Sequence, residues 1–276
     1  IDLFLTDPAN AGIVNGTVYL WTHNTAISST IPGNSTYNYT SDDYAKYNLT
    51  GGITTAIPAI SGGVVPDGKI ASGQGFFIEA ATGLSNGTYT ASFKNSMRVA
   101  GSNDRFYRVN QMAAANTATN NIVKNRIWVN ISNAQGAYNQ ILIGYLTGAT
   151  DGYDKLYDGK PMAAGNVLSM YSLIGTEAYS IQGKALPFAV ADVVPLGYKT
   201  TVAGSYTIAI ENFDGLFENQ NVYLVDKLLN VTQNLKAGVY TFTTASGTFD
   251  NRFEIRYNDG TALATENPIS STVDFT

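Results

Sequence analysis

The chain has 276 residues, of which 44% are hydrophobic and only 13% are charged, about half of the roughly 25% that is usual in globular domains. Its net charge of −5 and the lack of a basic cluster argue against a nucleic-acid interface or docking on an anionic membrane, and no apolar run approaches the ~20 residues of a membrane helix. Cysteine is absent and His23 is the single histidine, which excludes disulfides and thiolate sites and removes most zinc sites and histidine-based triads.

The composition favours strands over helices. Asn, Thr, Ser, Gly and Tyr replace the missing charged residues, with 27 Gly and 18 Tyr in the chain. Neutral polar and aromatic side chains with many glycines suit strands joined by tight turns, whereas long helices use Glu, Lys, Leu and Ala. We therefore predict an all-β fold of two packed units, each β-sandwich-like or jelly-roll-like, with long polar loops. The units span residues 1–119 and 120–258, and residues 259–276 form a linker or tail.

The first unit combines strands with a long polar region. The dipeptide Asn15-Gly16 predicts a turn, and the alternating pattern that follows it predicts a strand through residue 21. Residues 26–68 are rich in Ser, Thr, Gly, Asn and Pro, which predicts long surface loops with short strand pieces in a ligand-facing or variable region. A short helix is predicted over residues 42–47. Two further strands are predicted at 68–83 and 86–99. His23, at a strand end, is predicted to be a structural hydrogen-bonding residue.

The strongest strand pattern follows a weakly patterned boundary at residues 101–125. Ile127, Val129 and Ile131 alternate with more polar neighbours, residues 133–136 supply turn-forming side chains, and a second alternating run continues to residue 146. We expect the rest of the chain to be organised around this hairpin. Trp128 lies opposite the aliphatic residues and is predicted at an inter-sheet or inter-domain contact.

Seven further strand-like runs follow, with the spacing of a β-sandwich. Their sequences are VLSMYSLIG, AYSIQGKALPF, DVVPLGYKT, GSYTIAIEN, NVYLVDKLL, GVYTFTT and NRFEIRYN. Besides residues 42–47, short helices are predicted only at 113–115 and 214–217.

An acidic loop follows the hairpin directly, at residues 149–160. Its carboxylates Asp151, Asp154 and Asp158 could bind calcium, which prefers hard oxygen ligands. The spacing is not that of an EF-hand. Alternatively, the three side chains only cap the turns of a solvated loop. The sequence leaves both readings open, so that no cofactor is required and calcium is the candidate.

Aromatic side chains form the second candidate site. Planar rings that are exposed can stack on sugars, although rings in β-proteins more often fill cores or cross-strand pairs. The rings in or beside the polar loops are Trp21, Tyr37, Tyr39, Tyr44 and Tyr47.

Carboxylates give a weaker hint of catalysis. Glu211 and Asp214, with Glu218 nearby, could act as a pair in glycoside hydrolysis, and Asp154 is a further candidate. Glu79 lies in an apolar strand and would need a cleft to act as a catalytic acid. Acidic residues at strand ends are more often simply solvated.

A string of phrases along the chain resembles one family. In order they are NGTVYLWTHNT, DDYAKYNLTGG, IASGQGFFIEA, FKNSMR, RIWVNISNAQGAYNQILIGYLTGATDGYDKLYDGK, YSIQGKALPF, VPLGYKTTVAGSYTIAIENFDGLF, VYLVDKLL and GTFDNRFEIRY. Together they resemble the region found just ahead of the C-terminal sorting signal in large secreted and cell-surface proteins of flavobacteria, which leave the cell through the type IX secretion system.

The resemblance implies a β-rich extracellular module near the end of a large adhesin-like protein. It implies export by the type IX machinery through a C-terminal signal outside this segment, and a location that is secreted or on the outer cell surface. The family offers no catalytic residues to carry over. We therefore expect a non-enzymatic, structural or adhesive module that meets polysaccharide or other surface proteins.

Two alternatives remain open. The chain could be a subunit of an extracellular filament that self-associates when the tail at residues 271–276 inserts into a neighbour's sheet. It could also be a carbohydrate-active enzyme or a carbohydrate-binding module. Because the sequence begins at Ile1 without a leader, we expect a processed chain or a piece of a longer one.

Overall fold

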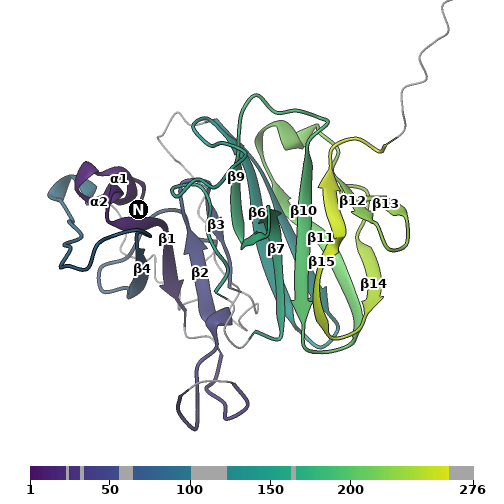
Figure 1. Cartoon of the computed structure of the whole chain (residues 1–276), viewed down its shortest axis with the longest axis horizontal. Coiled ribbons are helices and arrows are strands. Elements are labelled where there is room, and N and C mark those ends of the chain that lie inside the picture. The colour runs from purple at the N-terminus through teal and green to yellow at the C-terminus, as the bar shows by residue number, and fades with distance from the viewer. Residues whose placement is uncertain (23–24, 32–33, 56–64, 101–122, 163–165, 261–276) are drawn as a thin grey trace, which may run out of the picture.

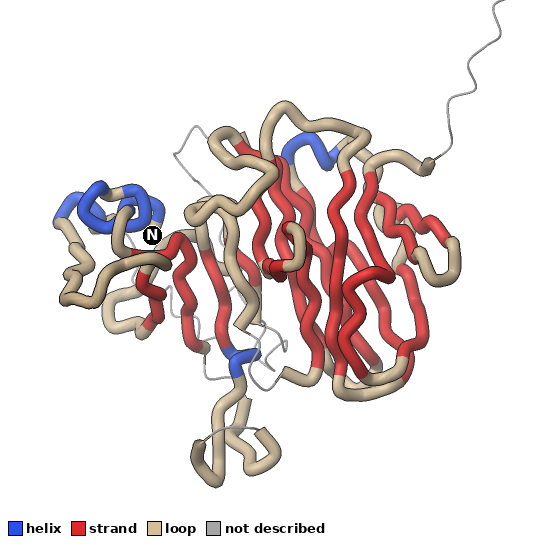
Figure 2. The backbone as a smooth tube through the Cα atoms, viewed as in Figure 1, coloured by secondary structure: helices blue, strands red, loops and turns tan. Residues whose placement is uncertain are grey.

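Three β-sheets make up the described part of the protein, which confirms the all-β prediction. The computed structural model describes residues 1–22, 25–31, 34–55, 65–100, 123–162 and 166–260. A four-stranded sheet near the N-terminus lies beside two larger sheets that stack face to face (Figure 1). The helices are short and lie at the margins of the sheets (Figure 2). Within these described residues, no helix has the length and apolar character needed to cross a bilayer.

The N-terminal unit is one antiparallel sheet with the strand order β3-β2-β1-β4. Its elements are α1 (Asp2–Thr6), α2 (Pro8–Ala11), β1 (Val14–Trp21), the 3-10 helix η1 (Ser41–Asp43), β2 (Tyr44–Tyr47), β3 (Gly52–Ile53), β4 (Phe76–Ala80) and the 3-10 helix η2 (Asn95–Met97). Val18 and Leu20 of β1 pack with Phe4 and Leu5 of α1 in a buried cluster. The described part of this unit is therefore a single sheet backed by short helices. It differs from the predicted sandwich, which would pack a second sheet against the first.

The C-terminal unit is a β-sandwich of two sheets, ordered β13-β12-β15-β10-β7-β8 and β14-β11-β5-β6-β9. Its elements are β5 (Lys124–Asn133), β6 (Tyr138–Leu146), β7 (Leu168–Ile174), β8 (Glu177–Tyr179), β9 (Ile181–Lys184), β10 (Val193–Thr200), β11 (Gly204–Phe213), the 3-10 helix η3 (Gly215–Glu218), β12 (Tyr223–Asp226), β13 (Val231–Asn234), β14 (Tyr240–Thr244) and β15 (Gly247–Arg256). Strands β6 and β9 run parallel. The pairs β10–β15, β10–β7, β11–β5 and β5–β6 are antiparallel.

Aliphatic and aromatic side chains from both sheets fill the sandwich. The ring of Tyr198, for example, contacts Phe242, Phe249 and Phe253 with centroid separations between 4.9 and 5.6 Å. Burying a large apolar side chain stabilises a fold by about 1.5–3 kcal/mol. This core is the largest cluster of buried apolar residues in the described chain and holds the sandwich together.

The hairpin β5–β6 is buried on both of its faces. Val129 and the other odd-numbered apolar residues of β5 face the sandwich core. Trp128 and Leu142, on the opposite face, pack against Ile53 of β3 and Ile181 of β9. The hairpin therefore belongs to the sandwich, and its outer face packs against the N-terminal unit. The prediction that Trp128 lies at an inter-sheet or inter-domain contact is confirmed, because its neighbours Ile53 and Gly52 belong to the N-terminal sheet.

Hydrogen bonds reinforce this junction. The Trp128 indole donates to the Gly52 carbonyl at 2.8 Å, and the Arg126 guanidinium donates to the Thr50 carbonyl at 3.3 Å. The acidic loop, residues 149–160, contributes backbone bonds: Gly16 N–H donates to the Lys155 carbonyl at 3.1 Å. The acidic loop therefore joins the two units through backbone hydrogen bonds.

Two predictions for the N-terminal unit are wrong. Asn15 and Gly16 do not form a turn but lie inside β1. Glycine is required at position 16 because a Cβ there would lie 2.1 Å from the Lys155 carbonyl oxygen, so a close approach of distant backbone, not a turn, explains this residue. Residues 42–47 are not a helix, since η1 ends at Asp43 and the next four residues pair with β1 as β2.

The remaining predictions of strands and helices are partly wrong and partly confirmed. The predicted strand at 86–99 is wrong, because only η2 forms there, and β13 was not predicted. The strand at 68–83 is confirmed in β4, the seven runs of the second half are confirmed, and the helix at 214–217 corresponds to η3. His23, the helix at 113–115 and the tail at 271–276 lie outside the described residues.

Candidate functional site

Four aromatic rings gather at one end of the N-terminal sheet. Trp21 packs edge-to-face with Tyr39 (centroids 5.1 Å apart, planes at 82°) and lies nearly parallel to Tyr44 at 6.5 Å. Tyr44 in turn packs edge-to-face with Phe77 at 5.6 Å. We call these four residues the aromatic cluster. Tyr39 and Phe77 are 50% and 56% exposed, so the cluster presents two rings to solvent. Trp21 and Tyr44 pack against these two rings and hold them in place.

Strand register assembles the aromatic cluster. Trp21 lies opposite Tyr44 across the β1–β2 pair, and Tyr19 lies opposite Phe77 across the β1–β4 pair. Because side chains alternate along a strand, residues 19 and 21 share one face while Leu20 between them faces the core. Cross-strand aromatic pairs contribute about 0.2–1 kcal/mol each. The sheet, and not a loop, therefore holds three of the four rings.

The loop that carries Tyr39 is itself tied to the sheet. Asp43 is buried, and its carboxylate accepts hydrogen bonds from the Thr25 amide at 3.1 Å and the Thr25 hydroxyl at 2.7 Å. Further along the loop, the Asn38 side chain donates to the carbonyl oxygens of Ile31 and Ser35 at 2.9 and 2.7 Å. These bonds order the described part of the loop next to Trp21.

The structure brings together three of the five predicted rings, Trp21, Tyr39 and Tyr44. Tyr37 is 59% exposed in the same loop as Tyr39. Tyr47 is only 6% exposed and lies beneath Gly68, where a Cβ would be 2.7 Å from its hydroxyl. Phe77 was missed by the sequence reasoning. Its signal was the Phe-Phe pair after Gly75, because in a strand one of two consecutive phenylalanines must face away from the core.

The three aspartates of the acidic loop have different surroundings. The Asp154 carboxylate accepts from the Thr150 amide, and the Asp158 carboxylate accepts from the amides of Asp154 at 2.5 Å and Gly183 at 2.8 Å. Asp151 is 68% exposed and lies 3.2 Å from the Lys184 ammonium. Two of the three therefore close turns or join the loop to β9. Among the described residues, no group of three or more His, Cys, Asp or Glu side chains is arranged to hold a metal ion.

Asp158 is the most perturbed of these acids. Burial raises the pKa of its carboxyl to about 7, while the hydrogen bonds from the Asp154 and Gly183 amides oppose the rise. Asp158 is 3% exposed, and its carboxylate lies where the acidic loop contacts β9. A carboxyl that binds a proton near neutrality makes this contact between the acidic loop and β9 sensitive to pH.

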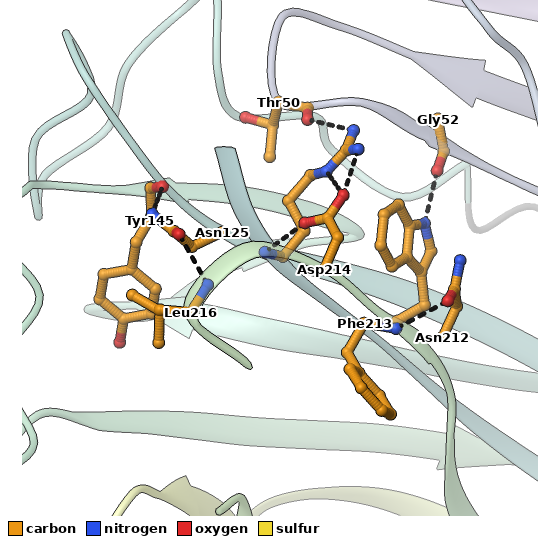
Figure 3. Close-up of polar contacts among 10 residues, drawn as sticks. Thr50, Gly52, Asn125, Tyr145, Asn212, Phe213, Asp214 and Leu216 are labelled. Carbon is orange, nitrogen blue, oxygen red and sulfur yellow. Dashed lines mark hydrogen bonds and ion pairs between the residues drawn. The ribbon is translucent and has the colours of Figure 1, made fainter. Parts of the chain in front are cut away.

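The candidate catalytic carboxylates are engaged and separated. Asp214 accepts two bonds from the Arg126 guanidinium, at 2.9 and 2.5 Å, and one from the Arg126 amide at 2.9 Å. Figure 3 shows this pair beside Thr50 and Gly52, within the junction between the units. Asp214 is therefore part of the contact that joins the N-terminal sheet to the sandwich.

Glu211 lies further along the sheet and belongs to a different cluster. Its carboxylate accepts from the Tyr138 hydroxyl, from Gln140 at 2.7 Å and from Asn130 at 3.2 Å. Asp214 and Glu211 therefore bind different partners, Arg126 in the first case and Asn130, Tyr138 and Gln140 in the second. Glu79 is exposed and accepts from Asn15 at 3.0 Å, and Glu218 is exposed at the end of η3.

Fold and site together define an all-β protein in which a small sheet, docked on a β-sandwich, carries an exposed aromatic cluster. The chain belongs to the family described as Domain of unknown function (DUF8693), which matches residues 1–257. The family thus spans both the N-terminal sheet and the sandwich. No curated protein and no solved structure matches the chain.

Proposed function

We propose that the chain is a non-enzymatic module of a secreted, adhesin-like surface protein and that it binds polysaccharide through the aromatic cluster. The observation that carries the proposal is the pair of half-exposed rings, Tyr39 and Phe77, held by Trp21 and Tyr44. Stacking on the apolar face of a sugar ring uses a planar side chain that is already fixed in place. Little conformational entropy is then lost on binding.

Two further observations support a binding role over a catalytic one. Asp214 is held by Arg126 within the junction, and Glu211 is bound by three donors elsewhere on the sheet. Neither carboxylate lies in the aromatic cluster. A catalytic pair would need both groups beside the bound sugar, so the ring surface and these acids do not combine into one site.

The binding test uses affinity electrophoresis of the 1–276 chain in gels that contain a neutral polysaccharide. Mixed-linkage β-glucan, galactomannan and xyloglucan are suitable probes. We expect at least one of them to retard the wild-type chain. Tyr39→Ala and Phe77→Ala should each weaken its binding by about 2- to 12-fold, the equivalent of the 0.5–1.5 kcal/mol that an aromatic contact contributes. Unaltered mobility of the wild-type chain in all gels would refute the proposal.

A matched control comes from Tyr89, which is 45% exposed outside the aromatic cluster and donates its hydroxyl to the Ser85 carbonyl at 3.0 Å. Tyr89→Ala removes an exposed ring of the same size and should leave polysaccharide binding unchanged. An equal loss of binding in Tyr89→Ala and Tyr39→Ala would mean that the effect does not arise at the aromatic cluster.

Export through the type IX system is the second part of the proposal, and it is supported by the sequence resemblance. The signal would lie outside this segment. Protease digestion of intact cells should remove the full-length protein from the surface of a wild-type flavobacterial host. The same treatment should leave it intact inside a host that lacks a functional type IX system. Equal surface exposure in both hosts would disprove this route.

Calcium binding by the acidic loop stays a prediction. Thermal melts of the chain with calcium and with chelator, repeated for Asp154→Asn, test it. A ligand that binds only the folded state must raise the melting temperature. A rise that Asp154→Asn abolishes would establish the site. Identical melts would leave the three aspartates with the turn-closing contacts described above.

A further inference from the structure

A second aromatic contact surface lies next to the aromatic cluster, on the acidic loop. Tyr153 is 48% exposed, and its ring stacks on that of Tyr179 in β8 with centroids 5.8 Å apart and planes at 30°. Tyr179 itself is only 3% exposed. An exposed ring is thus supported from below by a buried one, as Trp21 and Tyr44 support the rings of the aromatic cluster.

Tyr19 connects the two surfaces. It shares a face of β1 with Trp21, about 6.6 Å away along the strand, and it lies opposite Phe77 on β4. Tyr19 also lies opposite Lys46 across the β1–β2 pair, and the Lys46 ammonium donates at 3.3 Å to the hydroxyl of Ser180, the residue after Tyr179. Tyr153, which stacks on Tyr179, therefore lies beside the face of the sheet that carries Tyr19 and Trp21.

The backbone holds Tyr153 in place relative to the N-terminal sheet. On the C-terminal side of Tyr153, the Lys155 carbonyl accepts from Gly16 of β1 at 3.1 Å and the Leu156 carbonyl accepts from Leu49 at 3.1 Å. These bonds pin the acidic loop against the same sheet that carries the aromatic cluster. A ligand that touches both surfaces would therefore meet rings in fixed positions.

The charges around this path disfavour an anionic ligand. Glu79 is exposed, and Asp151 is 68% exposed beside the buried Lys184 ammonium, which it shares with Asp192, so this group keeps a net negative charge; the Glu177–Lys160 pair is neutral as a whole. The Lys46 ammonium faces inward and donates to the Ser180 hydroxyl at 3.3 Å. Fixed negative charge along a binding path repels acidic polymers and leaves uncharged ones unaffected.

We infer that one uncharged, linear polysaccharide chain lies across both surfaces, from Tyr39 and Phe77 of the aromatic cluster to Tyr153 of the acidic loop. This inference rests on the proposed function and names the ligand class and a further specificity residue for the same site. Tyr153 acts there as an outer contact that only a ligand of several sugar units reaches. Affinity should therefore keep rising with chain length beyond the sugars that the aromatic cluster alone contacts.

The experiment compares Tyr153→Ala, Tyr153→Phe and the control Tyr89→Ala, with Tyr39→Ala as the cluster variant. The probe is whichever of mixed-linkage β-glucan, galactomannan or xyloglucan retards the wild-type chain, together with its disaccharide and hexasaccharide fragments, measured by calorimetry. Tyr153→Ala should weaken binding of the polymer and the hexasaccharide by about 2- to 12-fold. It should not change disaccharide binding, and Tyr153→Phe should retain the wild-type affinity because the ring remains.

Each outcome decides the question. If Tyr39→Ala weakens binding and Tyr153→Ala does not, the proposed function stands and the extended path is refuted. If Tyr153→Ala weakens disaccharide and hexasaccharide binding equally, Tyr153 is not an outer contact and the inference fails. Binding to alginate with equal or higher affinity would overturn the assignment to uncharged polymers. A melting temperature of Tyr153→Ala equal to that of Tyr89→Ala confirms that a loss of binding does not come from unfolding.

Discussion

Replacement of Trp128 should loosen the junction between the two units before it unfolds the sandwich. The Trp128 side chain is 5% exposed, packs with Ile53, Leu142 and Ile181, and donates to the Gly52 carbonyl at 2.8 Å. Truncation of a buried tryptophan to alanine costs about 3–5 kcal/mol. Trp128→Phe keeps most of the ring but removes the donor from a buried carbonyl, which costs about 1–3 kcal/mol.

The assay uses the fact that the chain contains two tryptophans. In a Trp128 variant, fluorescence reports only on Trp21 in the N-terminal sheet, whereas circular dichroism reports mainly on the strands of the sandwich. With Trp128→Ala, the fluorescence transition in urea should come at a lower concentration than the dichroism transition. In Trp21→Phe, which keeps the junction intact, the two transitions should coincide.

A matched control is Ser132→Ala, on the same strand and facing the same side as Trp128 but without its packing. Its free energy of unfolding should stay within about 0.5 kcal/mol of wild type. Two results would refute the reasoning: coincident transitions in Trp128→Ala, or a loss of less than about 1 kcal/mol. Either would mean that the N-terminal sheet does not depend on this contact.

Three further changes test separate features. Gly16→Ala places a Cβ 2.1 Å from a backbone oxygen of the acidic loop and should destabilise the fold by about 1–3 kcal/mol, whereas Gly12→Ala, with nothing within 4 Å, should be neutral in the same urea titration. Arg252→Met leaves the fully buried Asp226 without its 2.8 Å ion pair and should cost about 3–5 kcal/mol in urea unfolding; a loss below 1 kcal/mol would contradict the pair's importance. Because the folded pKa of Asp158, about 7, lies above its ordinary value of 3.8, its contribution to stability is present at low pH and is lost as the pH rises through that window. Asp158→Asn should remove this dependence when free energies of unfolding are compared across the window, and an identical pH profile in both proteins would exclude it.

The fold was predictable where one strand carries its own pattern. In β5 the odd-numbered aliphatic residues and Trp128 on the other face are both buried, so alternation alone located the strand and singled out Trp128. The strand β13, Val231–Asn234, has no such pattern, because its residues are half-buried or exposed and it is held by pairing with β12. At Asn15-Gly16 the local turn signal was misleading, since the cause of the glycine lies in the approach of residue 155.

The candidate site was predictable only in part, because it depends on register. Trp21 and Tyr44 could be suspected from composition, but their pairing across β1 and β2 follows from a register that no local pattern fixes. Tyr47 carries the same composition signal and lies buried on the other side. Tyr153 reaches the same region from the C-terminal unit, through a loop whose placement depends on long-range backbone bonds.

The bonds that join the N-terminal sheet to the hairpin and to the acidic loop link residues that are far apart in the chain. The Trp128–Gly52 bond joins residues 76 apart, and the bond from Thr17 to the Asp158 carbonyl joins residues 141 apart. Contacts this distant in sequence form late, because a long loop must close before they contribute. During synthesis from the N-terminus, the strands that carry the aromatic cluster therefore emerge early, but their sheet is completed late. We expect the face that carries the aromatic cluster to reach its final form only after the hairpin and the acidic loop have left the ribosome. A partly emerged chain would then lack the ordered aromatic cluster.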